Sequence, residues 1–235
     1  MVDLLSKLRR RRPAGSGTCD AGYHEGRQTR ASLRYRLRRR SDEVVRCARR
    51  YGPYPLETIL DVGTADGLML ARLGRSYPDA RRVGIDLSRD LLATSTEPDQ
   101  TLVLADAQDL PARRGTWDLA VATAVIEHVP DPPRVMAGIA SCLRPGGLLV
   151  LTAPDPFWEH LATLVGHLAD EQHHEVMNLE RLVALCEDGG LRVVEASKFM
   201  LSPVGLPFEL AVERLVRGLR LDFLFANQVV AAIRP

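Results

Sequence analysis

Three aspartates stand in or directly after successive short apolar runs of the sequence: Asp61, Asp86 and Asp106. Because the carboxyl ends of parallel strands meet at one edge of a sheet, we expect these carboxylates to lie close together. A carboxylate about 20 residues after a first glycine turn accepts hydrogen bonds from ribose hydroxyls, and the third carboxylate would reach an adenine amino group. Singly, each aspartate is more often a cap at a strand end. Together they favour a ligand with a ribose, an adenine and a positive charge, and they would repel phosphates.

The turn after the first apolar run has glycines that let the backbone come close to a ligand. Gly63 and Gly67 lie in the segment 61–67 (Asp-Val-Gly-Thr-Ala-Asp-Gly), and we expect the amides that follow them to point at the ligand. A dinucleotide fingerprint needs glycine at the first, third and sixth positions, but here Ala65 and Leu68 occupy the third and sixth. A site that grips a pyrophosphate is therefore disfavoured. Ala65 fits its position without strain if its φ is negative.

Apolar runs alternate with amphipathic segments from Pro55 onward. The pattern predicts strands at residues 58–62, 82–86, 101–105, 118–123, 148–152, 191–199 and 225–233. It predicts helices over 67–73, after the N-caps Asp131 and Asn178, and over 207–219, with the second helix ended by residues 145–147. Near-continuous apolar strands separated by helices are typical of a sheet covered on both faces. The sequence therefore predicts an α/β fold with a doubly wound, mostly parallel seven-stranded sheet.

The net charge of +1 hides a division of the chain into a basic and an acidic part. Residues 1–50 hold 15 Lys and Arg against 5 Asp and Glu, whereas residues 51–235 hold 16 against 25. We therefore expect a basic N-terminal helical arm at 1–50 before a single domain at 51–235. The arm has the charge to attract nucleic acid, the surface of an anionic membrane or a phosphorylated substrate. The alternatives are a helix that docks on the acidic body, or a solvated disordered segment.

Composition excludes several classes of protein. Only Lys7 and Lys198 are lysines, and neither follows a glycine, so the P-loop pattern is absent from the sequence. The four cysteines are widely separated and form no C-x-x-C pair, which argues against a zinc site and a disulfide framework. No run approaches the ~20 apolar residues that a membrane span needs, and the first residues lack the apolar run of a secretory signal. We therefore expect a cytoplasmic protein without a metal site.

Five segments of the sequence carry a family resemblance. They are 59–67 (ILDVGTADG), 84–88 (GIDLS), 105–111 (ADAQDLP), 117–129 (WDLAVATAVIEHV) and 143–150 (LRPGGLLV). In this order they resemble the class I S-adenosylmethionine-dependent methyltransferases, particularly small-molecule enzymes like those of ubiquinone and menaquinone synthesis. The resemblance covers roughly residues 55–200. It implies a Rossmann-like methyltransferase fold, S-adenosylmethionine as cofactor and a small-molecule acceptor.

The resemblance also implies which residues contact the cofactor. These are Asp61, Gly63, Ala65, Gly67, Asp86, Leu87, Asp106, Ala107 and Thr123. Asp61, Gly63 and Gly67 would line the methionine end, while Ala65 replaces the middle glycine of the family loop. Asp86 would hold the ribose, and Asp106 with the backbone of Ala107 would hold the adenine. The backbone at Thr123 would lie beside the sulfonium. The implied chemistry is an in-line displacement, in which an acceptor oxygen, nitrogen or carbanion attacks the methyl carbon; O-methylation is favoured.

Candidates for a general base are His128, His173 and His174, because histidine titrates near neutrality. The competing interpretations are that Glu127 and His128 form a structural pair, and that the two adjacent histidines belong to the entrance of a helix. Residues 155–175 carry an apolar stripe at helical spacing, which predicts a lid over an apolar or amphipathic acceptor.

Other interpretations of the sequence remain open. The apolar side of the helix at 207–219 (Phe208, Val212, Leu215 and Leu219) is expected either to serve the acceptor or to pack on the sheet. A nucleic-acid methyltransferase recruited by the basic arm is an alternative function, although residues 123–126 (Thr-Ala-Val-Ile) lack the N-P-P-[YFW] type of motif. A protein that binds S-adenosylmethionine without transferring its methyl group is a further alternative.

Overall fold

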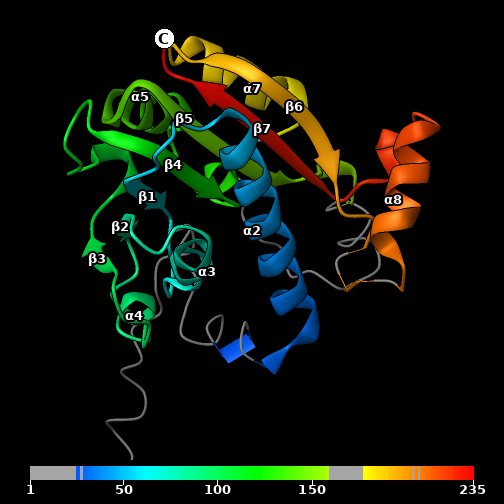
Figure 1. Cartoon of the computed structure of the whole chain (residues 1–235), viewed down its shortest axis with the longest axis horizontal. Helices are drawn as coiled ribbons and strands as arrows, with labels where there is room; N and C mark the ends of the chain where they lie inside the picture. Colours follow the sequence, from blue (N-terminus) through cyan, green and yellow to red (C-terminus); the bar gives the residue numbers. More distant parts are fainter. Residues whose placement is uncertain (1–24, 27–28, 159–176, 203, 206) are drawn as a thin grey trace, which may run out of the picture.

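The computed structural model describes residues 25–26, 29–158, 177–202, 204–205 and 207–235. Seven strands form one sheet in the order β3-β2-β1-β4-β5-β7-β6 (Figure 1). Strands β1 to β5 pair in parallel, and β7 runs antiparallel to both β5 and β6. The predicted doubly wound, mostly parallel seven-stranded sheet is confirmed.

The strand bounds agree with the sequence pattern, except at one place. The strands are β1 (Thr58–Val62), β2 (Arg81–Asp86), β3 (Thr101–Leu104), β4 (Trp117–Thr123), β5 (Leu143–Pro154), β6 (Arg192–Phe199) and β7 (Asn227–Ile233). The predicted start of β5 at residue 148 is wrong. Leu143 already pairs with Trp117 across a register shift in β4, so the segment 145–147 belongs to the strand instead of ending a helix.

Helices flank the strands, and two of them begin at the predicted caps. They are α2 (Ala31–Tyr51), α3 (Leu68–Ser76), α4 (Arg89–Leu92), α5 (Pro132–Cys142), α7 (Leu179–Asp188) and α8 (Glu209–Gly218), with 3₁₀ turns η1 (Ala107–Asp109), η2 (Ile126–His128) and η3 (Asp222–Leu224). Asp131 accepts a hydrogen bond from the Arg134 amide at 3.1 Å, and Asn178 accepts one from the Arg181 amide at 2.8 Å. Both caps leave fewer orphan amides in the first turn. Among the described residues, no helix is long and apolar enough to cross a bilayer.

Each face of the sheet has its own apolar core. Neighbouring side chains of a strand point to opposite faces, so Ile59 packs with Val44 of α2 and Leu70 of α3, whereas Leu60 packs with Ile139 of α5. Helices α2 and α3 therefore cover one face, and α5 and α7 cover the other (Figure 1). The two layers hold the strands so that their carboxyl ends form one edge of the sheet.

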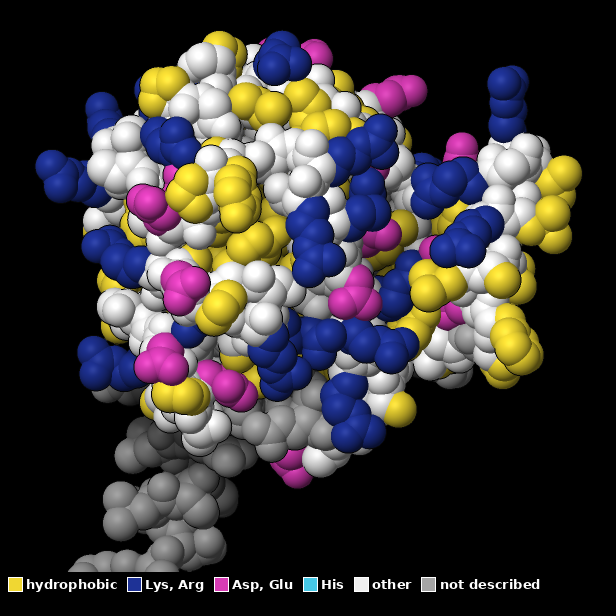
Figure 2. Space-filling model, viewed as in Figure 1, with side chains coloured by type: hydrophobic (Ala, Val, Ile, Leu, Met, Phe, Trp, Pro, Cys, Tyr) yellow, Lys and Arg dark blue, Asp and Glu magenta, His cyan; other side chains and the backbone are white. Residues whose placement is uncertain are grey.

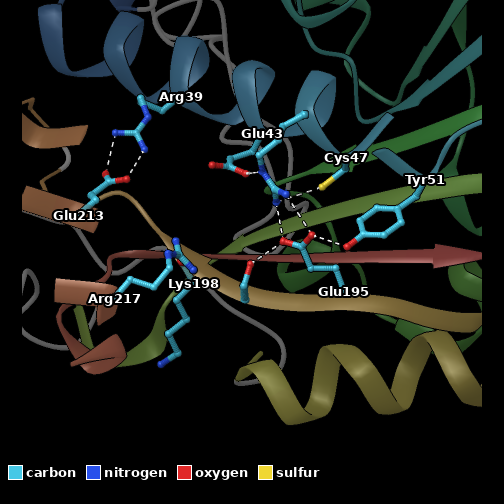
Figure 3. A network of polar contacts seen from close by, with 10 residues as sticks. Arg39, Glu43, Cys47, Tyr51, Glu195, Lys198, Glu213 and Arg217 are labelled. Carbon is cyan, nitrogen blue, oxygen red and sulfur yellow. Dashed lines mark hydrogen bonds and ion pairs between the residues drawn. The ribbon is translucent and has the colours of Figure 1, made fainter. Parts of the chain in front are cut away.

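The described part of the basic segment is mainly the helix α2, which packs over β4, β5 and β7. Figure 3 shows two of its arginines reaching acidic residues of the body. Arg39 makes a bidentate ion pair with Glu213 of α8 at 2.7 and 2.8 Å. Arg46 donates to Glu195 of β6, to which Tyr51 also donates at 3.0 Å. This helix is therefore docked on the acidic body, and its Val44 belongs to the core.

From the contacts of Glu195 we predict how the free energy of unfolding depends on pH in acid. Burial raises the pKa of this carboxyl, but hydrogen bonds from Arg46, Tyr51 and Ser197 outweigh it and lower the pKa from 4.5 to about 2. Because the folded pKa lies below the unfolded one, the stabilisation is complete above about pH 4.5 and is lost as the pH falls toward 2. We expect Glu195→Gln to lower the free energy of unfolding at pH 7 by about 1 kcal/mol, a value reduced by solvent screening.

Urea unfolding of Glu195→Gln and wild type at pH 7, 4 and 2.5 measures this effect. The difference between the two should shrink with falling pH. The matched control is Glu187→Gln, because Glu187 is exposed on α7 and should show no such difference. A constant difference at all three pH values would contradict the assignment.

Helix α8 turns its apolar face outward. Phe208, Val212, Leu215 and Leu219 are exposed, whereas Glu209 and Glu213 are buried. The alternative in which this apolar face packs on the sheet is therefore wrong. Figure 2 shows the hydrophobic side chains of α8 at the right edge of the view. The reason is electrostatic, because the two glutamates face Arg39 of α2 and the helix must turn its other side to solvent.

Candidate functional site

The ends of four adjacent strands meet at one edge of the sheet. Val62 of β1 pairs with Ile85 of β2, and Asp86 pairs with Leu104 of β3. On the other side, Val62 pairs with Ala122 of β4. The structure therefore brings the predicted residues at the ends of β1, β2, β3 and β4 together, as the sequence predicts for a parallel sheet.

The turn after β1 is held by hydrogen bonds within the chain. The amides of Gly63 and Thr64 donate to the Ile85 carbonyl at 2.8 and 3.0 Å, and the Ala65 amide donates to Asp86 Oδ2 at 2.8 Å. The Gly67 amide donates to the Thr64 carbonyl at 3.0 Å. The expectation that the amides after Gly63 point at a ligand is therefore wrong for those of Thr64, Ala65 and Gly67. The same bonds disfavour a phosphate here, because phosphate sites rely on free amides.

Two glycines of this turn are required by the backbone and by their neighbours. Gly63 has φ +75°, and a Cβ on it would lie 2.1 Å from a methyl carbon of Val125. Gly67 has φ +77°, and a Cβ there would lie 2.2 Å from Nε2 of Gln100. Only glycine adopts this backbone and leaves these spaces without cost. The turn therefore packs closely against the segment after β4 and the segment before β3.

Ala65 stands between these glycines with φ +54°, so the condition for an unstrained alanine at this position, a negative φ, is not met. An L-residue in the left-handed region costs about 1–2 kcal/mol, and part of this would be offset by the freedom that glycine adds to the unfolded chain. We therefore expect Ala65→Gly to raise the free energy of unfolding by about 0.5–1 kcal/mol. Chemical denaturation measures this change.

The control for this variant is Gly63→Ala, which introduces both the strained φ and the collision with Val125. It should lower the free energy of unfolding by at least about 1 kcal/mol. If Ala65→Gly destabilised the chain instead, the positive φ at position 65 would be contradicted.

Asp86 is fixed in position by two backbone amides. Its Oδ2 accepts from Ala65, and its Oδ1 accepts from Ser88 at 2.7 Å. Each carboxylate oxygen keeps a further lone pair that accepts a hydroxyl hydrogen bond. Sequence analysis missed Ser88, which is buried and also caps α4. Its signal was the spacing Asp-x-Ser, which is typical of a turn closed by the aspartate.

The other two aspartates differ in burial. Asp61 is buried, and its Oδ2 accepts a hydrogen bond from the Thr64 hydroxyl at 2.8 Å. Asp106 is at the start of η1, where its Oδ1 accepts from the Gln108 amide at 2.8 Å. Leu87 is 53% exposed directly after β2. Asp61 thus lies in the interior, in β1, whereas Asp106 lies at the surface after β3. Hydrogen bonds hold both carboxylates in place.

The segment after β4 carries the described histidine candidate. Thr123 is followed by Ala124, whose φ is +54° and whose amide donates to the Thr152 carbonyl at 2.7 Å. His128 lies in η2, where its Nε2 is 3.9 Å from Oε1 of Glu127. The His128 side chain is 27% exposed and the Glu127 side chain is 3% exposed. The ring is therefore partly open to solvent while its acidic partner is buried.

Several of the predicted site residues belong to segments of the sequence other than the ends of β1 to β4. His173, His174 and most of the lid predicted at 155–175 lie outside the described residues. Of the lid, the structure places Asp155, which is buried, and Phe157, which is 61% exposed. Within the described ranges, no group of three His, Cys, Asp or Glu residues is arranged to hold a metal ion.

The fold is a Rossmann-like methyltransferase fold. Its defining features are the sheet order, the antiparallel β7, the glycine turn after β1 and the fixed carboxylate at the end of β2. Residues 23–196 match the model of a family described as a methyltransferase domain. The chain belongs to this family, and the predicted class I S-adenosylmethionine-dependent methyltransferase family is confirmed.

Relatives with assigned names include two bacterial methyltransferases. Trans-aconitate 2-methyltransferase of Deinococcus radiodurans is 30% identical over 100 residues, which are 43% of this chain and 39% of that protein. Ubiquinone biosynthesis O-methyltransferase of Coxiella burnetii is 29% identical over 170 residues, which are 65% of this chain and 71% of that one. The chain thus spans about two fifths of the Deinococcus protein. Among solved structures, an S-adenosylmethionine-dependent methyltransferase of Thermotoga maritima has a TM-score of 0.66 at 16% identity, covering 91% of this chain and 95% of that one, a likeness of fold.

Proposed function

We propose that this protein transfers a methyl group from S-adenosylmethionine to a small-molecule acceptor. The observation that carries the proposal is Asp86, whose carboxylate is held by two backbone amides at the end of β2 with its remaining lone pairs available. Family membership supports the reaction. When bound, S-adenosylmethionine supplies an activated methyl group on a positively charged sulfur.

The residues of the carboxyl edge suit this cofactor in charge. Asp86 and Leu87 would hold the ribose, while Asp106 and the backbone of Ala107 would hold the adenine. The methionine part would lie along Asp61, Gly63, Ala65 and Gly67, with the backbone of Thr123 beside the sulfur. Carboxylates stabilise a cation and repel phosphates. The internal bonding of the turn amides supports the same choice, because it leaves little to grip a pyrophosphate.

The chain's own contribution to the reaction is alignment and a base. Holding two reactants in line accounts for much of the rate enhancement of a displacement on an activated methyl group. The fixed turn and the fixed carboxylate provide that alignment. We propose O-methylation as the reaction, since the two named relatives are a carboxylate and a ubiquinone-pathway methyltransferase by their names. A hydroxyl acceptor must lose its proton, so a nearby base would help, whereas a carboxylic acid acceptor is already ionised at neutral pH.

We propose His128 as that base, because its ring is partly exposed next to the end of β4 and beside a buried carboxylate. We expect His128→Asn to lower kcat about 10²-fold at pH 7 while the affinity for S-adenosylhomocysteine stays within two-fold. The pH profile of kcat should lose its limb near neutrality. Steady-state kinetics and isothermal titration calorimetry check the two parts.

The control is Glu127→Gln, which keeps the ring and removes only its acidic neighbour. We expect a smaller loss of kcat and a shifted pH profile in this variant. If kcat of His128→Asn were unchanged, the histidine would be structural only, and the base would have to lie elsewhere.

The function is tested by incubating the protein with S-adenosylmethionine carrying an isotopically labelled methyl group and with a bacterial metabolite extract. Mass spectrometry should find at least one small molecule that gains the labelled methyl group, and Asp86→Ala should fail to produce it. Label in nucleic acid alone would favour the alternative acceptor. The absence of any labelled product, with S-adenosylhomocysteine still bound, would favour the non-catalytic alternative.

A further inference from the structure

A cavity of about 620 Å³ lies between the C-terminal halves of α2 and α3. Five arginines line it: Arg46, Arg49 and Arg50 from α2, and Arg72 and Arg75 from α3. Asp42 is the acidic residue of the lining. Figure 2 shows Lys and Arg side chains gathered along the middle of this face, where Figure 1 places α2. The cavity has a size typical of sites for small molecules.

The positive charge of the cavity is only partly balanced within the protein. Arg46 is paired with Glu43 and Glu195. Arg72 donates to the Ser41 hydroxyl at 2.6 Å and lies 3.8 Å from Asp42.

The remaining three arginines, Arg49, Arg50 and Arg75, form no ion pair within the part of the chain that the structure describes. Burial lowers the pKa of Arg72, and the charges of Arg75 and Arg38 act in the same direction against the opposing charge of Asp42. The guanidinium groups of Arg72 and Arg75 on α3 therefore repel each other.

Helix dipoles account for only part of this arrangement. Arg49, Arg50 and Arg75 lie in the last turns of their helices, where a positive charge is favourable. That effect acts along each helix separately. It gives no reason for two helices to turn their arginines toward a shared cavity, and it does not apply to Arg72 in the middle of α3.

We propose that this cavity binds a small anion that carries several phosphate groups. Guanidinium groups bind phosphate oxygens through paired, charge-assisted hydrogen bonds, and each phosphate would offset the repulsion between neighbouring arginines. The site is separate from the carboxyl edge, because Arg75 lies eight residues beyond Gly67 on α3, or about 12 Å along its axis. It is independent of the methyl-transfer proposal.

Isothermal titration of the full chain with tripolyphosphate tests the proposal. We expect saturable binding to one site, and at least a ten-fold weaker affinity in Arg72→Gln/Arg75→Gln. If the double variant fails to fold, Arg75→Gln alone replaces it in the test and should weaken binding several-fold. The matched control is Arg214→Gln/Arg220→Gln, which removes the same charge from exposed positions on α8 and just after its end, and should bind as wild type does. S-adenosylhomocysteine should bind all these variants equally, which separates the two sites.

Three results would overturn the proposal. The first is failure of tripolyphosphate to bind the wild type at millimolar concentration and low salt, and the second is equal binding to the cavity and control variants. The third result is tighter binding of a 20-base-pair DNA duplex, or of vesicles with phosphatidylserine, that both variants weaken alike and that falls steeply with salt. That result would indicate an extended basic surface instead of a defined cavity.

Discussion

Asp86→Ala will weaken the binding of S-adenosylhomocysteine by about 10²–10⁴-fold. Under the proposed ribose assignment, the variant loses two hydrogen bonds between a carboxylate and the ribose hydroxyls, and bonds to charged groups contribute about 1.5–3 kcal/mol each. It also releases the amides of Ala65 and Ser88, which the carboxylate now holds at 2.8 and 2.7 Å. Isothermal titration calorimetry measures the affinity, and circular dichroism checks that the variant is folded.

Two further variants make this test specific. Asp86→Asn keeps one oxygen acceptor but removes the charge, so its affinity should fall between those of wild type and Asp86→Ala. Asp109→Ala removes an exposed carboxylate from η1, close to the same edge, and should bind nearly as wild type does. Unchanged affinity in Asp86→Ala would contradict the ribose assignment.

Arg39→Met will lower the free energy of unfolding by about 3–5 kcal/mol. The Arg39 side chain is 6% exposed, and its partner Glu213 is 8% exposed. Removing one partner of a buried ion pair leaves the other charge buried and uncompensated. Glu209 lies 3.6 Å from the same guanidinium and loses its countercharge too. Urea unfolding followed by circular dichroism measures the loss.

A double variant separates the ion pair from the packing of the helix. Arg39→Met/Glu213→Leu replaces both charges with apolar groups and should recover most of the lost stability. Arg38→Met removes an exposed arginine one position away and should change the free energy of unfolding by less than about 0.5 kcal/mol. If Arg39→Met matched wild type, α2 would not be docked through this pair.

The fold could be predicted from the sequence because its strands are nearly continuous apolar runs. Such runs locate buried strands within one or two residues, as at Thr58–Val62. The start of β5 was mispredicted because Pro145 and the two glycines after it look like a helix end, whereas pairing with β4 decides the structure there. The orientation of α8 also depends on a distant partner, since Arg39 lies 174 residues before Glu213.

The sequence was enough to select the side chains that we propose for the candidate site. It was not enough to give the backbone conformation of the turn after β1. The spacing of Asp61, Asp86 and Asp106 follows from strand register, which the apolar pattern sets. The φ of Ala65 and the internal bonding of the turn amides depend on how the turn packs against β2 and Val125. Local sequence does not encode that packing.

A crystal structure of the chain with S-adenosylhomocysteine tests the central claim most directly. It should show the ribose hydroxyls within hydrogen-bonding distance of the Asp86 carboxylate, the adenine beside Asp106, and the sulfur near the backbone of Thr123. A nucleoside found elsewhere, for example against α2, with the three carboxylates facing solvent, would contradict the account.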